Sequence, residues 1–279
     1  MSPEDAALIR TLIEENPSDS RRSLSRKLCL AWGWKQPNGA LRDMVCRGLM
    51  LALHRAGHIE LPPKRFSPLN PLADRGKPLE ALVSREPIQD ALSRILPLEI
   101  RRARRTAEEK LFNSLIEQHH YLGYCQPVGE HLKYLIFALG RPVACIAFSS
   151  APRHIGCRDR FIGWSPEARK RNLHLIAYNT RFLILDWVTV PNLASYLLGR
   201  MARVLPGDWQ ELYNHAVYFV ETFVDTERFR GTCYQAANWI YLGKTTGRGK
   251  NDQTNKVNRS IKAVWGYPLS KDFRDRLCQ

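Results

Sequence analysis

The segment from Glu221 to Lys250 constrains the fold of this chain more than any other stretch. Its sequence, ETFVDTERFRGTCYQAANWIYLGKTTGRGK, predicts a buried strand, a helix of small and aromatic residues, a second short strand and a basic glycine-containing loop. Together with the segment before it, the predicted order is strand, helix, strand, helix, strand, which is typical of an α/β domain. Carboxylates, amides and arginines are denser here than a hydrophobic core needs, so the pattern favours a polar site.

Length and composition limit the class of protein. The chain has 279 residues, of which 44% are hydrophobic, so it can bury the core of one large domain or two modest ones. It contains no apolar run of the roughly 20 residues that a membrane helix needs, and its first residues lack a signal-peptide pattern. The seven cysteines include no CxxC pair, which fits a reducing compartment. We therefore expect a soluble, cytoplasmic protein with no membrane partner.

The charge balance points to an anionic partner. The formal net charge is +15 at pH 7, and the basic residues also cluster locally. Such a balance favours nucleic acid, with DNA as the first expectation, because phosphate is the commonest anionic partner of basic proteins. A basic surface with no binding role is the alternative.

The first 66 residues predict a small helical domain. Three segments with helical spacing of apolar residues are followed by HIELPP, a short extended wing, which is the winged helix-turn-helix plan. Asn38 would cap the third helix or touch DNA. A helical interaction module is the alternative for the whole unit. In the DNA-binding interpretation, six cations would contact phosphate: Arg21, Arg22, Arg26, Lys27, Arg42 and Arg47.

The remainder of the chain predicts a proline-rich linker followed by a second domain. Residues 67–98 contain five prolines and would form a linker with one short helix. Residues 99–279 would form the α/β domain with a basic C-terminal tail. The domain starts with an amphipathic helix over IRRARRTAEEKLFNSLIEQHHYLGY, and a β-hairpin turns at Gly140-Arg141. The predicted fold class is thus α+β, a winged-helix-like helical domain joined to a mixed α/β domain.

The order of strands and helices over about residues 105–245 resembles the GNAT acyltransferase fold. In that family two neighbouring parallel strands diverge to admit the pantetheine of acetyl-CoA, and RFLILDWVTV and AVYFVETFVD would be these strands. The family's phosphate-binding turn is rich in glycine, whose backbone amides cradle the pyrophosphate. Here the turn reads VTVPNLASYLL, without glycine and with Pro191, which has no N–H to donate. The departure argues against acetyl-CoA as the cofactor.

Longer motifs resemble the Druantia anti-phage family, component A, over essentially the full length. They are LSRKLC, GALRDMVCR, NTRFLILDWVTVPNLAS and the segment that begins at Glu221. The resemblance implies phage defence together with other defence-system proteins. Because relatives occur beside transposase-like proteins, it also implies DNA processing by mobile elements.

Three carboxylates are candidate metal ligands. Asp186, Glu221 and Asp225 lie on or just after two neighbouring apolar strands, and carboxylate oxygens suit Mg²⁺. A two-metal site could cleave phosphodiesters, with Glu221 as ligand or base. The alternatives are a strand-face position for Asp186 and a helix cap for Asp225. Glu221 is the strongest candidate, because a carboxylate inside YFVETFV must be paired or functional.

Other candidates complete the predicted site. Asn179 and Asn238 would orient a substrate, and His120 would act as a base, although a histidine at a helix C-terminus is also favoured by the helix dipole. Four cations would hold phosphate: Arg181, Lys244, Arg248 and Lys250. For the last three, a surface turn is the alternative.

These patterns predict a DNA-binding component of a bacterial anti-phage system, or a protein that processes mobile-element DNA. It would recognise DNA and, if the carboxylates hold metal, cleave it. A GNAT-like acyltransferase and a non-catalytic DNA-binding adaptor are the alternatives, so the sequence leaves open whether the chain is an enzyme.

Overall fold

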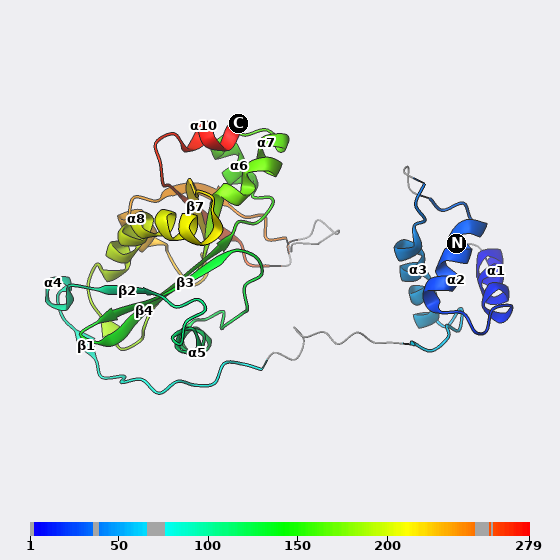
Figure 1. Ribbon diagram of the computed structural model, residues 1–279, viewed down its shortest axis with the longest axis horizontal. Helices are drawn as coiled ribbons and strands as arrows, with labels where there is room; N and C mark the ends of the chain where they lie inside the picture. Colours follow the sequence, from blue (N-terminus) through cyan, green and yellow to red (C-terminus); the bar gives the residue numbers. More distant parts are fainter. Residues whose placement is uncertain (1–2, 36–38, 66–75, 249–256, 258) are drawn as a thin grey trace. The chain divides into compact units, whose positions relative to one another are not determined.

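The computed structural model describes residues 3–35, 39–65, 76–248, 257 and 259–279, and the chain divides into two compact units, Met1–Arg75 and Gly76–Gln279 (Figure 1). No described helix is both long enough and apolar enough to cross a membrane.

The N-terminal unit consists of three helices around a small core. The helices are α1 (Pro3–Glu14), α2 (Arg21–Ala31) and α3 (Asp43–Arg55). Ser20 caps α2 by accepting a hydrogen bond from the Ser23 N–H, as expected for a serine before a helix. The buried core includes Ile9, Leu24, Leu28 and Met50.

The segment expected to form a wing contains no strand among its described residues, and the wing stays a prediction. After α3 the chain is extended, but Ile59 and Leu61 are buried in the helical core instead of projecting from it. Arg21 Nε holds the end of the segment by donating to the Pro62 carbonyl oxygen at 2.7 Å. The apolar residues of HIELPP therefore serve packing, and the unit is a three-helix domain with an extended tail.

The C-terminal unit is built on a seven-stranded mixed sheet with the order β2-β3-β4-β5-β7-β9-β8. Within this sheet, only β5 and β7 pair in parallel. The strands are β2 (Glu99–Arg102), β3 (His131–Ala138), β4 (Arg141–Ser150), β5 (Ile176–Ile184), β7 (Phe219–Asp225), β8 (Ile240–Lys244) and β9 (Lys262–Pro268).

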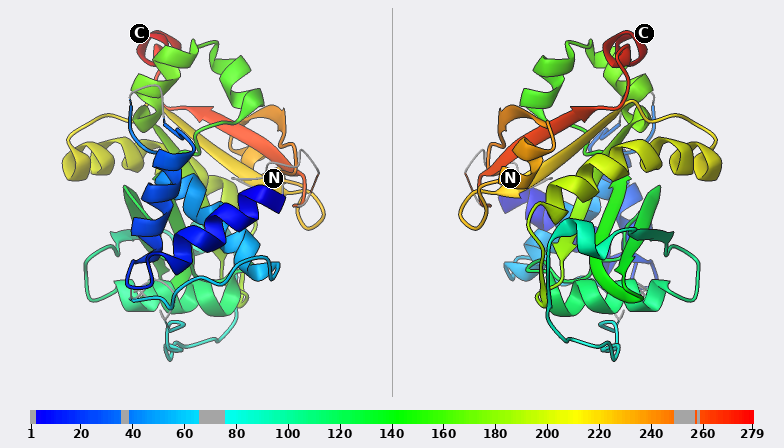
Figure 2. Two further views of the ribbon diagram at one scale, coloured as in Figure 1. Left: turned by 90° about the vertical axis from the view of Figure 1, so that its right-hand side faces the viewer. Right: turned by 90° about the vertical axis from the view of Figure 1, so that its left-hand side faces the viewer.

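Helices cover both faces of the sheet. On β3, the Lys133 ammonium bonds to Glu109 of α5 (Glu109–His119), whereas the hydroxyl of the next residue, Tyr134, bonds to Asp208 of α8 (Leu193–Tyr213). Since successive strand residues point to opposite faces, α5 and α8 lie on opposite sides. The right-hand view of Figure 2 shows α8 across one face of the strands.

The helix α8 packs on the main core through one apolar face. Its buried side chains recur at helical spacing and join the main core: Leu193, Leu197, Leu198, Met201, Leu205 and Trp209. Three shorter helices gather at one end of the unit (Figure 1), namely α6 (Gly156–Ile162), α7 (Pro166–Asn172) and α10 (Phe273–Cys278). They cover a separate apolar cluster around Phe219 and Phe273.

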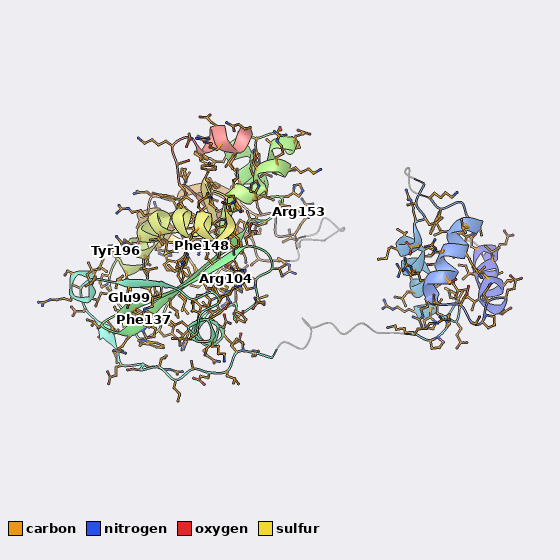
Figure 3. All side chains as sticks on the ribbon, viewed as in Figure 1. Glu99, Arg104, Phe137, Phe148, Arg153 and Tyr196 are labelled. Carbon is orange, nitrogen blue, oxygen red and sulfur yellow. The ribbon has the colours of Figure 1, made fainter. Side chains whose placement is uncertain are left out.

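Two boundaries differ from the sequence-based expectation. Residues 88–95, expected in the linker, belong to the C-terminal unit: β1 (Ile88–Gln89) pairs with β6 (Val188–Thr189), and Ile95 of α4 (Leu92–Ile95) is buried in its core. The basic start of the expected helix at residue 100 is instead the edge strand β2, where Glu99 lies opposite Phe137 in the register (Figure 3). Charged side chains suit an exposed edge strand, which explains the difference.

Other predicted elements are confirmed. The hairpin β3–β4 turns through Leu139 and Gly140, both with positive φ, as a two-residue hairpin turn requires. The predicted helix after β7 is α9 (Thr232–Ala236). The basic C-terminal tail contains the strand β9 and the helix α10.

The strands β5 and β7 separate after four residue pairs. They are paired from Ile176 opposite Phe219 to Asn179 opposite Thr222, and beyond this point β5 continues along β4 while β7 continues along β9. We call this divergence the fork. It is the structural feature that positions the site described below.

Gly266 of β9 provides a test of the packing around β7. A Cβ at this position would overlap the buried Phe219 ring and approach Leu242 Cδ1 to 2.9 Å. We expect Gly266→Ala to lower the free energy of unfolding by about 1–3 kcal/mol, the usual cost of overpacking a core. Gly199→Ala is the matched control, because nothing lies within 4 Å of its Cβ position in α8. There alanine should stabilise by about 0.5–1 kcal/mol. Urea unfolding measures both, and equal effects would contradict the packing argument.

Candidate functional site

A cavity of about 470 Å³ opens at the fork. Its walls come from the diverging parts of β5 and β7, the end of α5, α9 and the loop before α9. The volume lies within the range of small-ligand pockets. Because β5 and β7 no longer pair here, the backbone groups that these strands turn toward each other have no strand partner on that side. The cavity therefore combines side-chain and backbone hydrogen-bonding groups.

Three side chains hold the fork open. Thr222 Oγ1 donates to the Asn179 carbonyl oxygen at 3.2 Å, so this acceptor bonds to a side chain where the ladder between β5 and β7 ends. The Asn179 amide nitrogen donates to the carbonyl oxygens of Ala147 and Arg181, across a bulge between β4 and β5. The Tyr234 hydroxyl, from α9, donates to Asn179 Oδ1 at 2.9 Å. All three groups line the cavity.

Aromatic rings form much of the cavity wall. Tyr178 of β5 contacts Phe223 of β7, with ring centroids 4.7 Å apart on either side of the fork. At another part of the wall, Tyr121 contacts Phe229 at 5.3 Å. These two rings are unusually accessible, since 38% of Tyr121 and 50% of Phe229 are exposed. Exposed aromatic rings beside a cavity favour a planar or apolar ligand.

The loop from residue 226 to residue 231 contributes Phe229 and Arg230 to the cavity lining and places Arg228 over the Tyr121 ring, and we call it the RFR loop. At its start, the Asp225 carbonyl oxygen accepts hydrogen bonds from the N–H groups of Arg228 and Phe229, and Asp225 Oδ1 accepts one from the Glu227 N–H. The Asp225 carboxylate thereby stabilises the turn that begins the loop.

Gly231 fixes the other end of the RFR loop. Its φ of 73° lies in the left-handed region, and a Cβ there would come within 3.1 Å of the Trp265 indole nitrogen. A residue without a side chain is therefore required by both conformation and space. With both ends held, the loop is ordered before any ligand binds.

The imidazole of His120 is neutral. Burial first, and the nearby Arg181 charge second, lower its pKa to about 4. His120 Nδ1 accepts a hydrogen bond from the Leu122 N–H at 3.2 Å, which places the ring proton on Nε2. The ring stacks on Tyr121 at 4.8 Å between centroids. His120 thus offers one N–H donor beside the exposed aromatic pair.

Three cations lie in the cavity lining or over one of its exposed rings. Arg230 and Lys262 line the cavity, and the Arg228 guanidinium lies 5.2 Å from the centre of the Tyr121 ring. None of these three forms an ion pair with a carboxylate of the described residues, although Lys262 lies opposite Asp225 in the register. The other lining carboxylate, Asp186, is bonded to His119 Nδ1 at 2.9 Å. The surroundings of the exposed rings therefore carry positive charge available to an anion.

A family model described as Druantia protein DruA matches residues 77–272, which is more than half of the chain. The chain belongs to this family. Membership of the DruA family indicates a role in anti-phage defence and confirms the family resemblance inferred from the sequence. The match begins at residue 77, so the two motifs before that residue lie outside it. No curated protein matches the sequence.

The DruA-family chain also has similarities to solved acetyltransferase structures. A GNAT-family acetyltransferase from Streptococcus pneumoniae has a TM-score of 0.39 and 13% identity, covering 62% of this chain and 99% of that one. An N-acetyltransferase from Staphylococcus aureus Mu50 has a TM-score of 0.36 and 9% identity, and the alignment covers 62% of this chain and 97% of that one. Aminoglycoside acetyltransferase AAC(6')-Ib, solved with coenzyme A and kanamycin, has a TM-score of 0.40 and 13% identity, and the alignment covers 64% of this chain and 98% of that one.

The three predicted metal ligands do not come together as one group among the described residues. No group of three histidine, cysteine, aspartate or glutamate residues that could hold a metal occurs in the part of the chain that the structure describes. Asp186 is bonded to His119, Asp225 stabilises the RFR loop, and Glu221 is buried in an ion pair away from the cavity lining. Glu221 and Asp225 lie on β7 and Asp186 follows β5, and each carboxylate has a different local partner.

Glu221 instead forms a fully buried pair with Arg158 of α6. Both side chains are 0% exposed, and Arg158 Nη1 donates to Glu221 Oε1 at 2.9 Å. Arg158 also pairs with Asp159 at 2.9 Å, so the guanidinium has a second counter-ion. Burial raises the pKa of Glu221 to about 7, against the opposing effect of Arg158. The sequence indicated that this carboxylate is either paired or functional, and the structure shows that it is paired with Arg158.

The remaining candidates in the C-terminal unit are dispersed. Asn179 supports the fork through bonds within the protein, and Arg181 bonds to the carbonyl oxygens of Gly123 and Thr180 beside the cavity. Asn238 is exposed after α9 with φ 61°, a left-handed position that asparagine tolerates, and it does not line the cavity. Lys244 ends β8, and Arg248 bonds to Thr246 at 3.5 Å. Lys250 lies outside the described residues.

The cations predicted in the N-terminal unit differ in their availability. Lys27 pairs with Asp19, Arg22 and Arg47 both pair with Asp43, and Arg21 bonds to the Pro62 carbonyl oxygen. Arg26 and Arg42 are exposed, whereas Asn38 lies outside the described residues.

Sequence reasoning missed the RFR loop, Tyr121 and Lys262. The signal was present: a phenylalanine between two arginines, directly before a glycine, is an unusual composition for a plain turn. The contact of Tyr121 with Phe229 spans more than 100 residues, and no local pattern predicts it.

Glu221→Gln tests the protonation of the buried pair. The folded protein binds this proton more tightly than the unfolded chain, because the pKa rises from 4.5 to about 7 on folding. The wild-type free energy of unfolding should therefore fall as pH rises from about 4.5 to about 7, and Glu221→Gln should remove that fall. Urea unfolding of both proteins at pH 5 and pH 8 measures the difference. Parallel pH dependences would show that the pKa of Glu221 is unshifted.

The neutral state of His120 is tested by NMR. Its ring resonance, identified as the one lost in His120→Asn, should stay in the uncharged form as pH falls from 8 to 5, because the pKa is lowered to about 4. The Arg181→Gln variant should raise that pKa slightly, since the Arg181 charge is the smaller of its two causes. A resonance that titrates near 6.5 would contradict the burial of this ring.

Proposed function

We propose that this protein recognises DNA as a component of an anti-phage defence system, and that the RFR loop and the cavity at the fork form the principal binding surface. Membership of the DruA family supports the defence role. The net charge of +15 supports an anionic partner. Both units carry an excess of lysine and arginine, with 12 against 8 acidic residues within 1–75 and 30 against 19 within 76–279. Charge alone therefore does not choose between them.

We choose the cavity over the N-terminal unit as the binding surface because three of its cations have no ion-pair partner in the part of the chain that the structure describes. Arg228, Arg230 and Lys262 have no ion-pair partner within the described ranges of the chain. Arg228 lies over the exposed Tyr121 ring, and Arg230 and Lys262 line the same cavity as the two exposed rings. A cation without a carboxylate partner can neutralise phosphate without first giving up another interaction. Arginine beside an exposed aromatic ring matches both chemical parts of a nucleic acid, the phosphate and the base.

The N-terminal unit provides weaker support for DNA binding. Four of its six predicted cations are already engaged with protein partners, which leaves Arg26 and Arg42 as exposed candidates. We assign this unit a secondary role in phosphate contact.

The acyltransferase alternative is less well supported by the residues at the fork. A helix N-terminus normally provides the amides that bind a pyrophosphate. Here no residue of α8 lines the cavity, and Pro191, just before that helix, has no N–H. The residues present do not fit the pyrophosphate of acyl-CoA, and we derive no acyl-transfer step. DNA cleavage is also outside the proposal, because the carboxylates do not form a metal-binding group in the described chain.

DNA binding is tested by fluorescence polarisation with a labelled single strand and a labelled duplex. Binding should weaken steeply between about 50 and 200 mM salt, as phosphate contacts require. The double variant Arg228→Ala/Arg230→Ala should bind less tightly and lower the slope of log K against log salt by about 2, one for each lost phosphate contact.

A matched double variant controls for the loss of charge. Arg200→Ala/Arg203→Ala removes two exposed arginines of α8, neither of which lines the cavity. It should reduce the slope far less. Equal effects of the two doubles would contradict the assignment of the surface, and an absence of binding would contradict the function. Coenzyme A is the comparison ligand, since its binding without DNA binding would favour the acyltransferase.

A further inference from the structure

The cavity at the fork is too small for a duplex segment but suitable for one unit of a strand. Its volume of about 470 Å³ is that of a small-molecule pocket. If the RFR loop contacts phosphate, the part of the nucleic acid that can enter such a cavity is a single base that has left its stack. Proteins that bind a base in this way stack it on apolar or aromatic side chains and contact its edge by hydrogen bonds.

A stacking surface is present at Phe229. This ring is 50% exposed, and it meets the Tyr121 ring at a tilt of 56° with 5.3 Å between centroids. Tyr121 is already stacked with His120 and has the Arg228 guanidinium over its ring, so it is less available for a base. Of these two rings, Phe229 is therefore the one more available to stack on a base. The RFR loop holds it in place through Asp225 and Gly231.

Hydrogen-bonding groups for a base edge lie in the same cavity. His120 offers its Nε2 proton, because Nδ1 accepts the Leu122 N–H. The separated strands add backbone groups beyond Asn179 and Thr222 that have no strand partner across the fork, although on β5 the carbonyl oxygens of Thr180 and Arg181 already accept side-chain hydrogen bonds. A base has both donors and acceptors on its edge, so it can satisfy groups of both kinds.

We propose that the cavity at the fork takes a single unstacked base of a DNA strand, stacked on Phe229, with the adjoining phosphates on Arg228, Arg230 and Lys262. This inference rests on the DNA-binding function proposed above and adds the mode of binding. Asp225 and Asp186 also line the cavity, but they are bonded to the RFR loop and to His119, respectively. The site therefore favours single-stranded or easily opened DNA over a stable duplex.

The test compares two short single strands of equal length, one of thymidine and one with abasic sugars throughout. Both have the same phosphates, so a difference in affinity measures the bases. The full-length wild-type protein should bind the thymidine strand roughly tenfold more tightly, because one stacked base contributes about 1–3 kcal/mol. In Phe229→Ala this ratio should fall close to one, whereas Phe229→Trp should preserve it.

Tyr196→Ala is the matched control. Tyr196 is a partly exposed aromatic residue of α8 outside the cavity lining, labelled in Figure 3, and its removal should leave the ratio unchanged. Thermal unfolding checks that Phe229→Ala is folded, which is expected because half of the ring is exposed.

The outcomes separate this inference from the function on which it rests. Salt-sensitive binding of equal strength to both strands would overturn base insertion while leaving DNA recognition in place. Failure to bind either strand would overturn both. Saturable binding of thymidine 5′-monophosphate, without any difference between the strands, would assign the cavity to a free nucleotide and overturn its use for a strand.

Discussion

The separation of β5 and β7 is the constraint on which the rest of the site depends. Two parallel strands that stayed paired would present a closed ladder and no cavity. Here the bulge between β4 and β5 turns β5 aside, and Thr222 Oγ1 bonds to the Asn179 carbonyl oxygen at the point where the ladder ends. The Asn179 side chain bonds to carbonyl oxygens on both sides of the bulge. An opening in a sheet is stable only if its freed polar groups find partners, and these residues provide them.

The same strand that bounds the fork also positions the RFR loop. Beyond the fork, β7 remains paired with β9 as far as Asp225 opposite Lys262, so its end is held rigidly by the sheet. Asp225 then bonds to the first turn of the loop, and Gly231 passes under Trp265 at its close. A loop fixed at both ends loses little conformational entropy when a ligand binds. The arginines and Phe229 are therefore preorganised by a strand that the core already requires.

The sequence predicted most of the fold but only part of the site, for physical reasons that differ between residues. Periodicity and turn residues are local, so the β3–β4 hairpin, β7 and α8 were predictable. The edge strand β2 was taken for the start of a helix, because its arginines obscured a pattern only four residues long. Glu221 was correctly identified as a carboxylate that needs a partner, but Arg158 is 63 residues away, and no spacing rule reveals such a pair. Asn179 does line the cavity, yet its amide is used to support the fork.

The distribution of protons and charges at the fork favours recognition over chemistry. Asp186 is bonded to His119, the Asp225 carboxylate is bonded within the RFR loop, and His120 is held neutral with its acceptor nitrogen occupied. A general base needs a free acceptor near the reacting group, and His120 Nε2 carries its proton outward as a donor instead. The arginines at the exposed rings, in contrast, have no ion-pair partner among the described residues. If the cavity takes a base as proposed, the site would distinguish DNA by how readily a base leaves its stack, because unstacking costs least in damaged, mismatched or single-stranded regions.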